Sequence, residues 1–150
     1  MLYCIRQDGS ESWSRIRPGL ALHDLAHYVV EKAMGFRQAF FGLVDQGFEI
    51  GDFEAPRSER PEELLPVNLP LESIQAEYLV NQLQTDDATG TDSASFLSTL
   101  QQTLNEKGLP VPEGLDQHLV DLMRDQYRRL VFQWMTLSPG QVMEFSFDLP

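Results

Sequence analysis

The stretch LHDLAHYVVEKAM, residues 22–34, decides the fold, because it combines an apolar stripe with four polar groups on one predicted helix. At about 100° per residue, its Leu, Val and Ala side chains fall between roughly 200° and 340° from His23. His23, Asp24, His27 and Glu31 share the neighbouring quadrant, from about 0° to 100°. The pattern therefore predicts an amphipathic helix that carries a polar cluster directly beside its buried face.

Both ends of the chain predict strands. Residues 2–6 and 13–17 are short β-prone runs that flank a turn at 8–11, which predicts a hairpin. Near the C-terminus, residues 142–147 alternate with period two, as a half-buried strand does. Because an isolated hairpin is only marginally stable, we expect the last strand to join it in a small antiparallel sheet.

The residues between these strands predict about five helices that cover one face of the sheet. They are expected at 22–34, at 36–46, at 71–84, from 92 or 93 to 106, and from 113 or 115 to about 135, with a polar turn at 86–92. Residues 48–70 hold four prolines and six acidic residues, which predicts one long surface loop. The sequence thus predicts a single α+β domain spanning residues 1–150.

The charge of the chain restricts its partners. It has 23 acidic and 11 basic residues, for a net charge of −12. Nucleic acids and anionic lipids are bound through clustered Lys and Arg, so we expect neither nucleic acid nor membrane as a partner. A basic protein partner, a bound cation or a homodimer is compatible with this charge.

Location is predicted from the N-terminus and from cysteine usage. The first residues lack a basic segment followed by an apolar one, so they predict a strand and not a signal peptide. The single cysteine, Cys4, has no internal disulfide partner, which is typical of a reducing compartment. A cytoplasmic protein is the expectation.

The polar cluster of residues 22–34 is a candidate metal site. Two histidines at i and i+4, here His23 and His27, reach one metal ion from a single helical face, as in known zinc helices. Glu31 or Asp24 can act as a further metal ligand or as a general base, and either can instead orient an imidazole by accepting its N–H. The alternative is structural, with Asp24 capping the first turn and Glu31 pairing with His27 on the helix surface.

Three segments carry a resemblance to a known family. They are LHDLAHYVVE at residues 22–31, FGLV at 41–44 and WMTLSPG at 134–140. The chain resembles a family of uncharacterised bacterial proteins with an LxHDLxHxxVE-like segment, an F/W-G-x-V segment and a late W-x-x-L-x-x-G. The resemblance implies a bacterial protein without an assigned activity.

Two functions follow as expectations. The first is a non-enzymatic interaction or binding domain, for which the acidic charge and the lack of a recognisable nucleophile motif argue. The alternative is a metal-binding protein or a metal-dependent, hydrolase-like enzyme that uses the face formed by His23, His27 and Glu31, with zinc or a similar divalent ion as cofactor.

Overall fold

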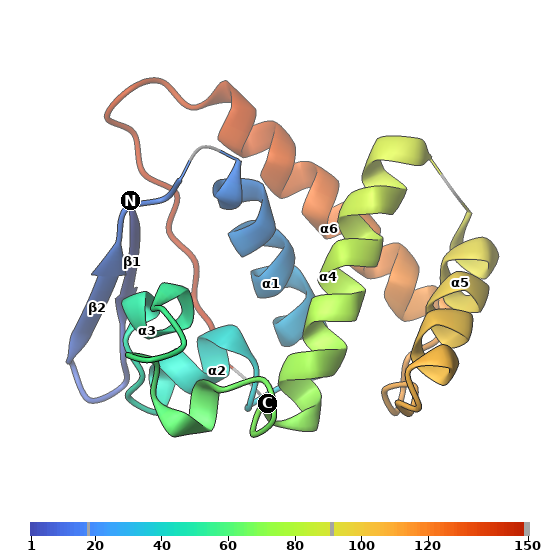
Figure 1. Ribbon diagram of the computed structural model, residues 1–150. Coiled ribbons are helices and arrows are strands. Elements are labelled where there is room, and N and C mark those ends of the chain that lie inside the picture. Colours follow the sequence, from blue (N-terminus) through green and yellow to red (C-terminus); the bar gives the residue numbers. More distant parts are fainter. Residues whose placement is uncertain (18, 91, 149–150) are drawn as a thin grey trace.

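The chain folds around one central helix, α1, in a computed structural model that describes residues 1–17, 19–90 and 92–148 (Figure 1). The elements in chain order are β1 (Leu2–Ile5), β2 (Glu11–Ser14), α1 (Leu20–Met34), α2 (Phe40–Asp45), α3 (Ile50–Glu54), the 3₁₀ turn η1 (Glu62–Leu64), α4 (Leu71–Thr89), α5 (Ser93–Glu106) and α6 (Gln117–Thr136). Helices make up 56% of the described residues, so they dominate over the two-stranded sheet. None of the helices in these ranges is long and apolar enough to cross a membrane.

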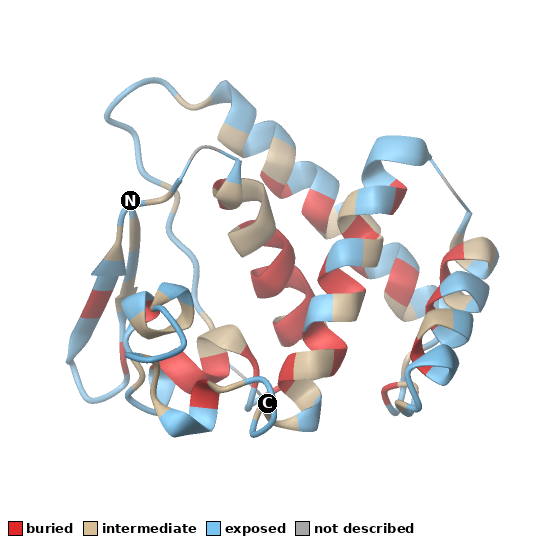
Figure 2. Cartoon of the chain, in the orientation of Figure 1, coloured by how far each residue is buried: buried red, intermediate tan, exposed pale blue. Residues whose placement is uncertain are grey.

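Helix α1 lies at the centre because its apolar stripe is covered from two directions. Gly19 and Gly35 bound the helix, both with positive φ (91° and 68°), a conformation that glycine adopts without steric cost. Ala26, Val29 and Val30 are fully buried, where α1 packs against α4 and α6. Figure 2 shows buried residues concentrated along α1 and on the sides of α4 and α6 that face it.

Helix α5 begins at the predicted cap, whereas α6 begins at Gln117, later than the predicted start at 113 or 115, and is capped by Asp116. The Asp92 carboxylate accepts a hydrogen bond from the amide of Ser95 at 2.9 Å, and Asp116 accepts one from the amide of Leu119 at 2.8 Å. The polar turn predicted at 86–92 is corrected, because α4 remains helical through Thr89. Residue 91, which also belongs to that predicted turn, lies outside the described residues.

The N-terminal hairpin is present, with a shorter second strand than predicted. Tyr3 pairs with Trp13, and the pairing ends at Ser14, not at residue 17. The Arg6 side chain is buried and donates to the carbonyl oxygens of Val44 and Phe48, which attaches the hairpin to α2 and to the segment that follows it. This attachment makes β2 one wall of the pocket described below.

The predicted C-terminal strand is wrong. Residues 141–148 are extended but join no sheet, and within the described ranges the sheet has two strands, β1 and β2. The segment packs on α1 instead, since the carbonyl of Ser146 accepts from the Tyr28 hydroxyl at 3.2 Å and from Lys32 Nζ at 2.8 Å. Phe145 and Phe147 stack on Tyr28, with ring centroids 4.8 Å and 6.3 Å away. The alternation of apolar and polar residues at 142–147 therefore reflects packing of this segment on α1 and not pairing in a sheet.

Two other boundaries differ from the prediction. The helix expected at 36–46 begins only at Phe40, because Glu72 Oε2 accepts from the amides of Arg37 and Gln38, at 2.7 Å each, and holds this segment out of the helix. The loop expected at 48–70 contains α3 and η1. A capping box between Glu49 and Asp52 starts α3.

Candidate functional site

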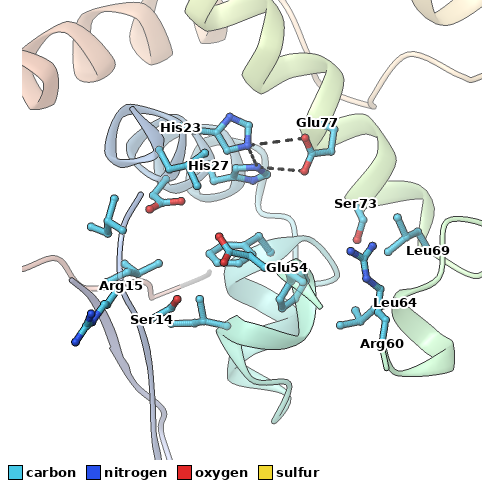
Figure 3. Close-up of a pocket in the computed structure, with 17 residues that line it drawn as sticks. Ser14, Arg15, His23, His27, Glu54, Arg60, Leu64, Leu69, Ser73 and Glu77 are labelled. Carbon is cyan, nitrogen blue, oxygen red and sulfur yellow. Dashed lines mark hydrogen bonds and ion pairs between the residues drawn. The ribbon is translucent and has the colours of Figure 1, made fainter. Parts of the chain in front are cut away.

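Three side chains from α1 and α4 converge on one point (Figure 3). The Nε2 atoms of His23 and His27 lie 3.2 Å apart. The Glu77 carboxylate on α4 approaches both rings, with Oε1 at 3.3 Å from His27 Nε2 and Oε2 at 4.0 Å from His23 Nε2. One helical face and one residue of the facing helix thus supply two imidazoles and a carboxylate.

The other nitrogen of each ring has its own acceptor. His27 Nδ1 lies 3.0 Å from Glu31 Oε1, and His23 Nδ1 lies 3.1 Å from Gln84 Oε1. Because these oxygens accept hydrogen bonds, they favour a proton on both Nδ1 atoms. The lone pairs of the two Nε2 atoms then face one another and Glu77.

Glu31 lies behind His27 and is fully buried. Its Oε2 accepts from the amides of Phe41, at 2.9 Å, and Gly42, at 3.4 Å, at the start of α2. Burial raises the pKa of this carboxyl, while the hydrogen bonds from His27 and from the two amides act in the opposite direction. Glu31 therefore orients the imidazole. Because it contacts Nδ1, it lies on the side of the ring away from Nε2 and does not contact the same metal position.

Glycine at position 42 makes this arrangement sterically accessible. A Cβ atom there would overlap the backbone carbonyl of Arg37. The close approach of the two backbone segments brings the amides of Phe41 and Gly42 to the Glu31 carboxylate. The FGLV segment and the HDLAHYVVE segment are therefore parts of one structural unit.

The charges around His27 favour its protonated form. Burial alone lowers the pKa of this imidazole, but hydrogen bonds and charge interactions with Glu31 and Glu77 outweigh burial and raise it to about 9. Burial also opposes ionisation of Glu77, and the contact with His27 outweighs it, so the pKa of Glu77 is lowered. The raised pKa of His27 thus favours a second ring proton, which Nε2 would direct at Glu77.

Two of the three separations in this cluster match a tetrahedral cation site, and the third, from His23 Nε2 to Glu77 Oε2, is longer at 4.0 Å. Two nitrogen ligands at 2.0–2.1 Å from a tetrahedral zinc ion lie about 3.3 Å apart. The separations from His27 Nε2 are 3.2 Å to His23 and 3.3 Å to Glu77. A metal ion in place of the proton would require the Glu77 carboxylate to move closer to His23.

The cluster lies on the wall of a pocket of about 290 Å³. Other walls come from β2, α2, α3 and the segment before α4. Phe40 lies between the histidine cluster and the α3 wall of the pocket, with its ring centroid 5.6 Å from that of His27 and 4.8 Å from that of Phe53. A ligand in the pocket would therefore contact the convergence point directly.

The remaining predicted site residue, Asp24, lines the same pocket but does not belong to the cluster of three. Its expected capping role is wrong, because α1 begins at Leu20 and Asp24 lies beyond the first turn. Burial raises the pKa of Asp24 to about 6, although the charges of His23 and His27 lower it. His118 is exposed at the start of α6 and is not part of the cluster.

Sequence reasoning missed Glu77 and Gln84. A signal for them exists on α4, where Ser73, Glu77 and Gln84 follow at intervals of four and seven residues, beside fully buried Ala76 and Val80. This polar stripe could have been matched to the polar quadrant of α1. The sequence does not show that α4 is the helix that packs against it.

Comparisons with protein families, with curated proteins and with solved structures found no match to this chain.

Proposed function

We propose that the protein binds a divalent metal ion, with zinc the best match, through His23, His27 and Glu77. Two imidazoles and one carboxylate form a ligand set found in catalytic zinc sites, where a water molecule takes the fourth position. Because the cluster lines a pocket of about 290 Å³, that water would face a ligand cavity. The proposed function is thus metal-dependent and hydrolase-like: His23, His27 and Glu77 would hold the ion, and the ion would supply an activated water.

The observation that carries the proposal is the pair of Nε2 atoms 3.2 Å apart, with an acceptor on each Nδ1. Two neutral imidazoles oriented in this way point lone pairs at one another, so they need a cation or a proton between them. Histidine ligands in metal sites commonly donate their second N–H to a carboxylate or carbonyl, which fixes the tautomer. Glu31 and Gln84 supply such acceptors.

The test is metal content and affinity. Protein expressed with zinc, manganese and iron supplements should contain about one metal ion per chain by elemental analysis, and calorimetric titration should give one zinc site. His27→Asn should remove that metal. His118→Asn, which removes an exposed histidine outside the cluster, is the matched control and should retain it.

A metal-dependent reaction can be followed on an activated ester such as 4-nitrophenyl acetate. Hydrolysis above the background rate should disappear with chelator and with His27→Asn, and zinc should restore it only in the parent and His118→Asn proteins. Protein without stoichiometric metal after all three supplements, or equal zinc affinity in His27→Asn, would contradict the proposal.

A further inference from the structure

Arg60 is an arginine that lies beside a pocket in a strongly acidic chain. It lines the pocket from the segment between α3 and η1, and its side chain is partly buried. Its Nε and Nη2 atoms donate to the carbonyl of Ala55, at 3.2 Å and 3.0 Å. In the part of the chain that the structure describes, no ion pair involves Arg60.

The contact with Ala55 orients the guanidinium and leaves most of its donors unused. Arginine has five N–H groups in a planar fork that suits a carboxylate, and two of them are directed at Ala55. Figure 3 shows the guanidinium of Arg60 directed from its loop back toward α4, the helix that carries Ser73 and Glu77. Its remaining N–H groups are therefore available to a ligand in the pocket.

The walls between Arg60 and the histidines are mainly apolar. Phe40 and Phe53 contact each other edge to face, and Leu64, almost fully buried, contributes a further apolar surface. A ligand that spans the pocket therefore needs an apolar body. At about 290 Å³ the pocket is at the small end of the usual range of about 300–1,000 Å³, so the ligand is small.

The charges around the pocket limit the ligand to a single negative charge. Two arginines line the pocket, Arg15 and Arg60, while Asp24, Glu54 and Glu77 contribute carboxylates to the same walls. Arg15 is exposed, and Figure 3 shows its guanidinium directed away from the other lining residues, so Arg60 is the arginine that a ligand would meet. A phosphate dianion at Arg60 would have that single guanidinium beside it and the carboxylates of Glu54 and Glu77 on the surrounding walls, whereas a monocarboxylate matches the fork of one arginine. The composition of the pocket thus favours a carboxylate.

We propose that the pocket binds a small amphipathic monocarboxylate, with its carboxylate on Arg60 and its apolar body against Phe40 and Phe53. The opposite end of the ligand then lies toward His23, His27 and Glu77. Only the placement of that end rests on the proposed metal site, because Arg60 recognises the carboxylate without the metal. The substrate class of the site is therefore a small monoanionic acid with an apolar body.

The test uses benzoate, benzamide and phenyl phosphate as matched probes, with binding measured by ligand-observed NMR on metal-free and on zinc-loaded protein. Benzoate should bind at least tenfold more tightly than benzamide and than phenyl phosphate. Arg60→Gln should weaken benzoate binding at least tenfold in both forms of the protein and leave zinc affinity unchanged. Arg60→Lys, which keeps the charge, should restore part of the binding.

Arg57→Gln is the matched control, because Arg57 is an exposed arginine of the same segment that does not line the pocket. It should change benzoate binding by less than twofold. Equal affinity for benzoate and benzamide, or tighter Arg60-dependent binding of phenyl phosphate, would overturn the proposal. Benzoate binding that requires zinc and survives Arg60→Gln would also overturn it, because the carboxylate would then be on the metal.

These outcomes separate the two proposals. Arg60-dependent benzoate binding in protein that takes up no zinc would contradict the metal site and support the carboxylate site. Zinc binding without Arg60-dependent benzoate binding would support the metal site and contradict the carboxylate site.

Discussion

The Glu31→Gln substitution tests whether the buried carboxylate organises both the fold and the site. Glu31 is fully buried and accepts from His27 Nδ1 at 3.0 Å, from the Phe41 amide at 2.9 Å and from the Gly42 amide at 3.4 Å. Glutamine has almost the same volume, but it replaces one acceptor oxygen by an NH₂ group. In either orientation of the amide, this NH₂ group faces an N–H group.

The magnitude follows from the contacts that are lost. A hydrogen bond to a charged group contributes about 1.5–3 kcal/mol, so losing at least one and weakening the others should lower the free energy of unfolding by about 2–4 kcal/mol. If the remaining oxygen stays with the amides of Phe41 and Gly42, His27 must move its proton to Nε2. The metal-facing lone pair is then lost, and zinc affinity should fall by about 10- to 100-fold.

The assay is urea unfolding of chelator-treated protein, followed by zinc titration of the folded variant. With an m value of about 2 kcal/mol per molar urea, the midpoint should decrease by about 1–2 M. Glu77→Gln is the comparison, since the Glu77 side chain is 53% exposed. It should lower zinc affinity with little effect on the midpoint. An unchanged midpoint for Glu31→Gln would refute the argument that this carboxylate holds α1 and α2 together.

Three further predictions concern the surroundings of the site. Gly42→Ala should lower the free energy of unfolding by about 1–3 kcal/mol in urea titration, because its Cβ meets a backbone carbonyl, and should also weaken zinc binding. Arg6→Met should lower the free energy of unfolding by at least about 2 kcal/mol, because two backbone carbonyls lose a charged donor. It should leave zinc affinity unchanged. In chelator-treated protein, Glu31 and Glu77 raise the pKa of His27 from 6.5 to about 9 against the effect of burial. The folded state therefore binds more protons than the unfolded state between these values, and stability should fall by up to about 3 kcal/mol as pH rises from 6.5 through 9 in urea midpoints measured at each pH.

Each of these predictions has a result that contradicts it. Gly42→Ala with parental stability would mean that the two backbone segments can separate without cost. Loss of zinc binding in Arg6→Met would show that the hairpin, and not α1 and α4 alone, positions the cluster. Stability of the chelated protein that rises between pH 6.5 and 9 would show that His27 is neutral in the folded state.

The sequence predicted features that depend on local periodicity and local hydrogen bonds. The helix at α1, with His23, His27 and Glu31 on one face, follows from 3.6 residues per turn, whatever packs against it. The aspartate cap of α5 was also predictable, because its hydrogen bond spans three residues. The expectation of a basic protein partner stays a prediction, and an association rate that falls with added salt would support it.

Tertiary structure decided which distant residues complete these local features. The period-two pattern of residues 142–147 predicted a strand, but alternation specifies only which side chains are buried, and the surface available to them was α1. Likewise, helix periodicity placed Glu31 near the histidines without showing on which side of the His27 ring it lies. Glu77 and Gln84 reach the histidines only because α4 packs on α1 in one particular register. That register depends on how the buried side chains of both helices interlock, and no short stretch of sequence contains this information.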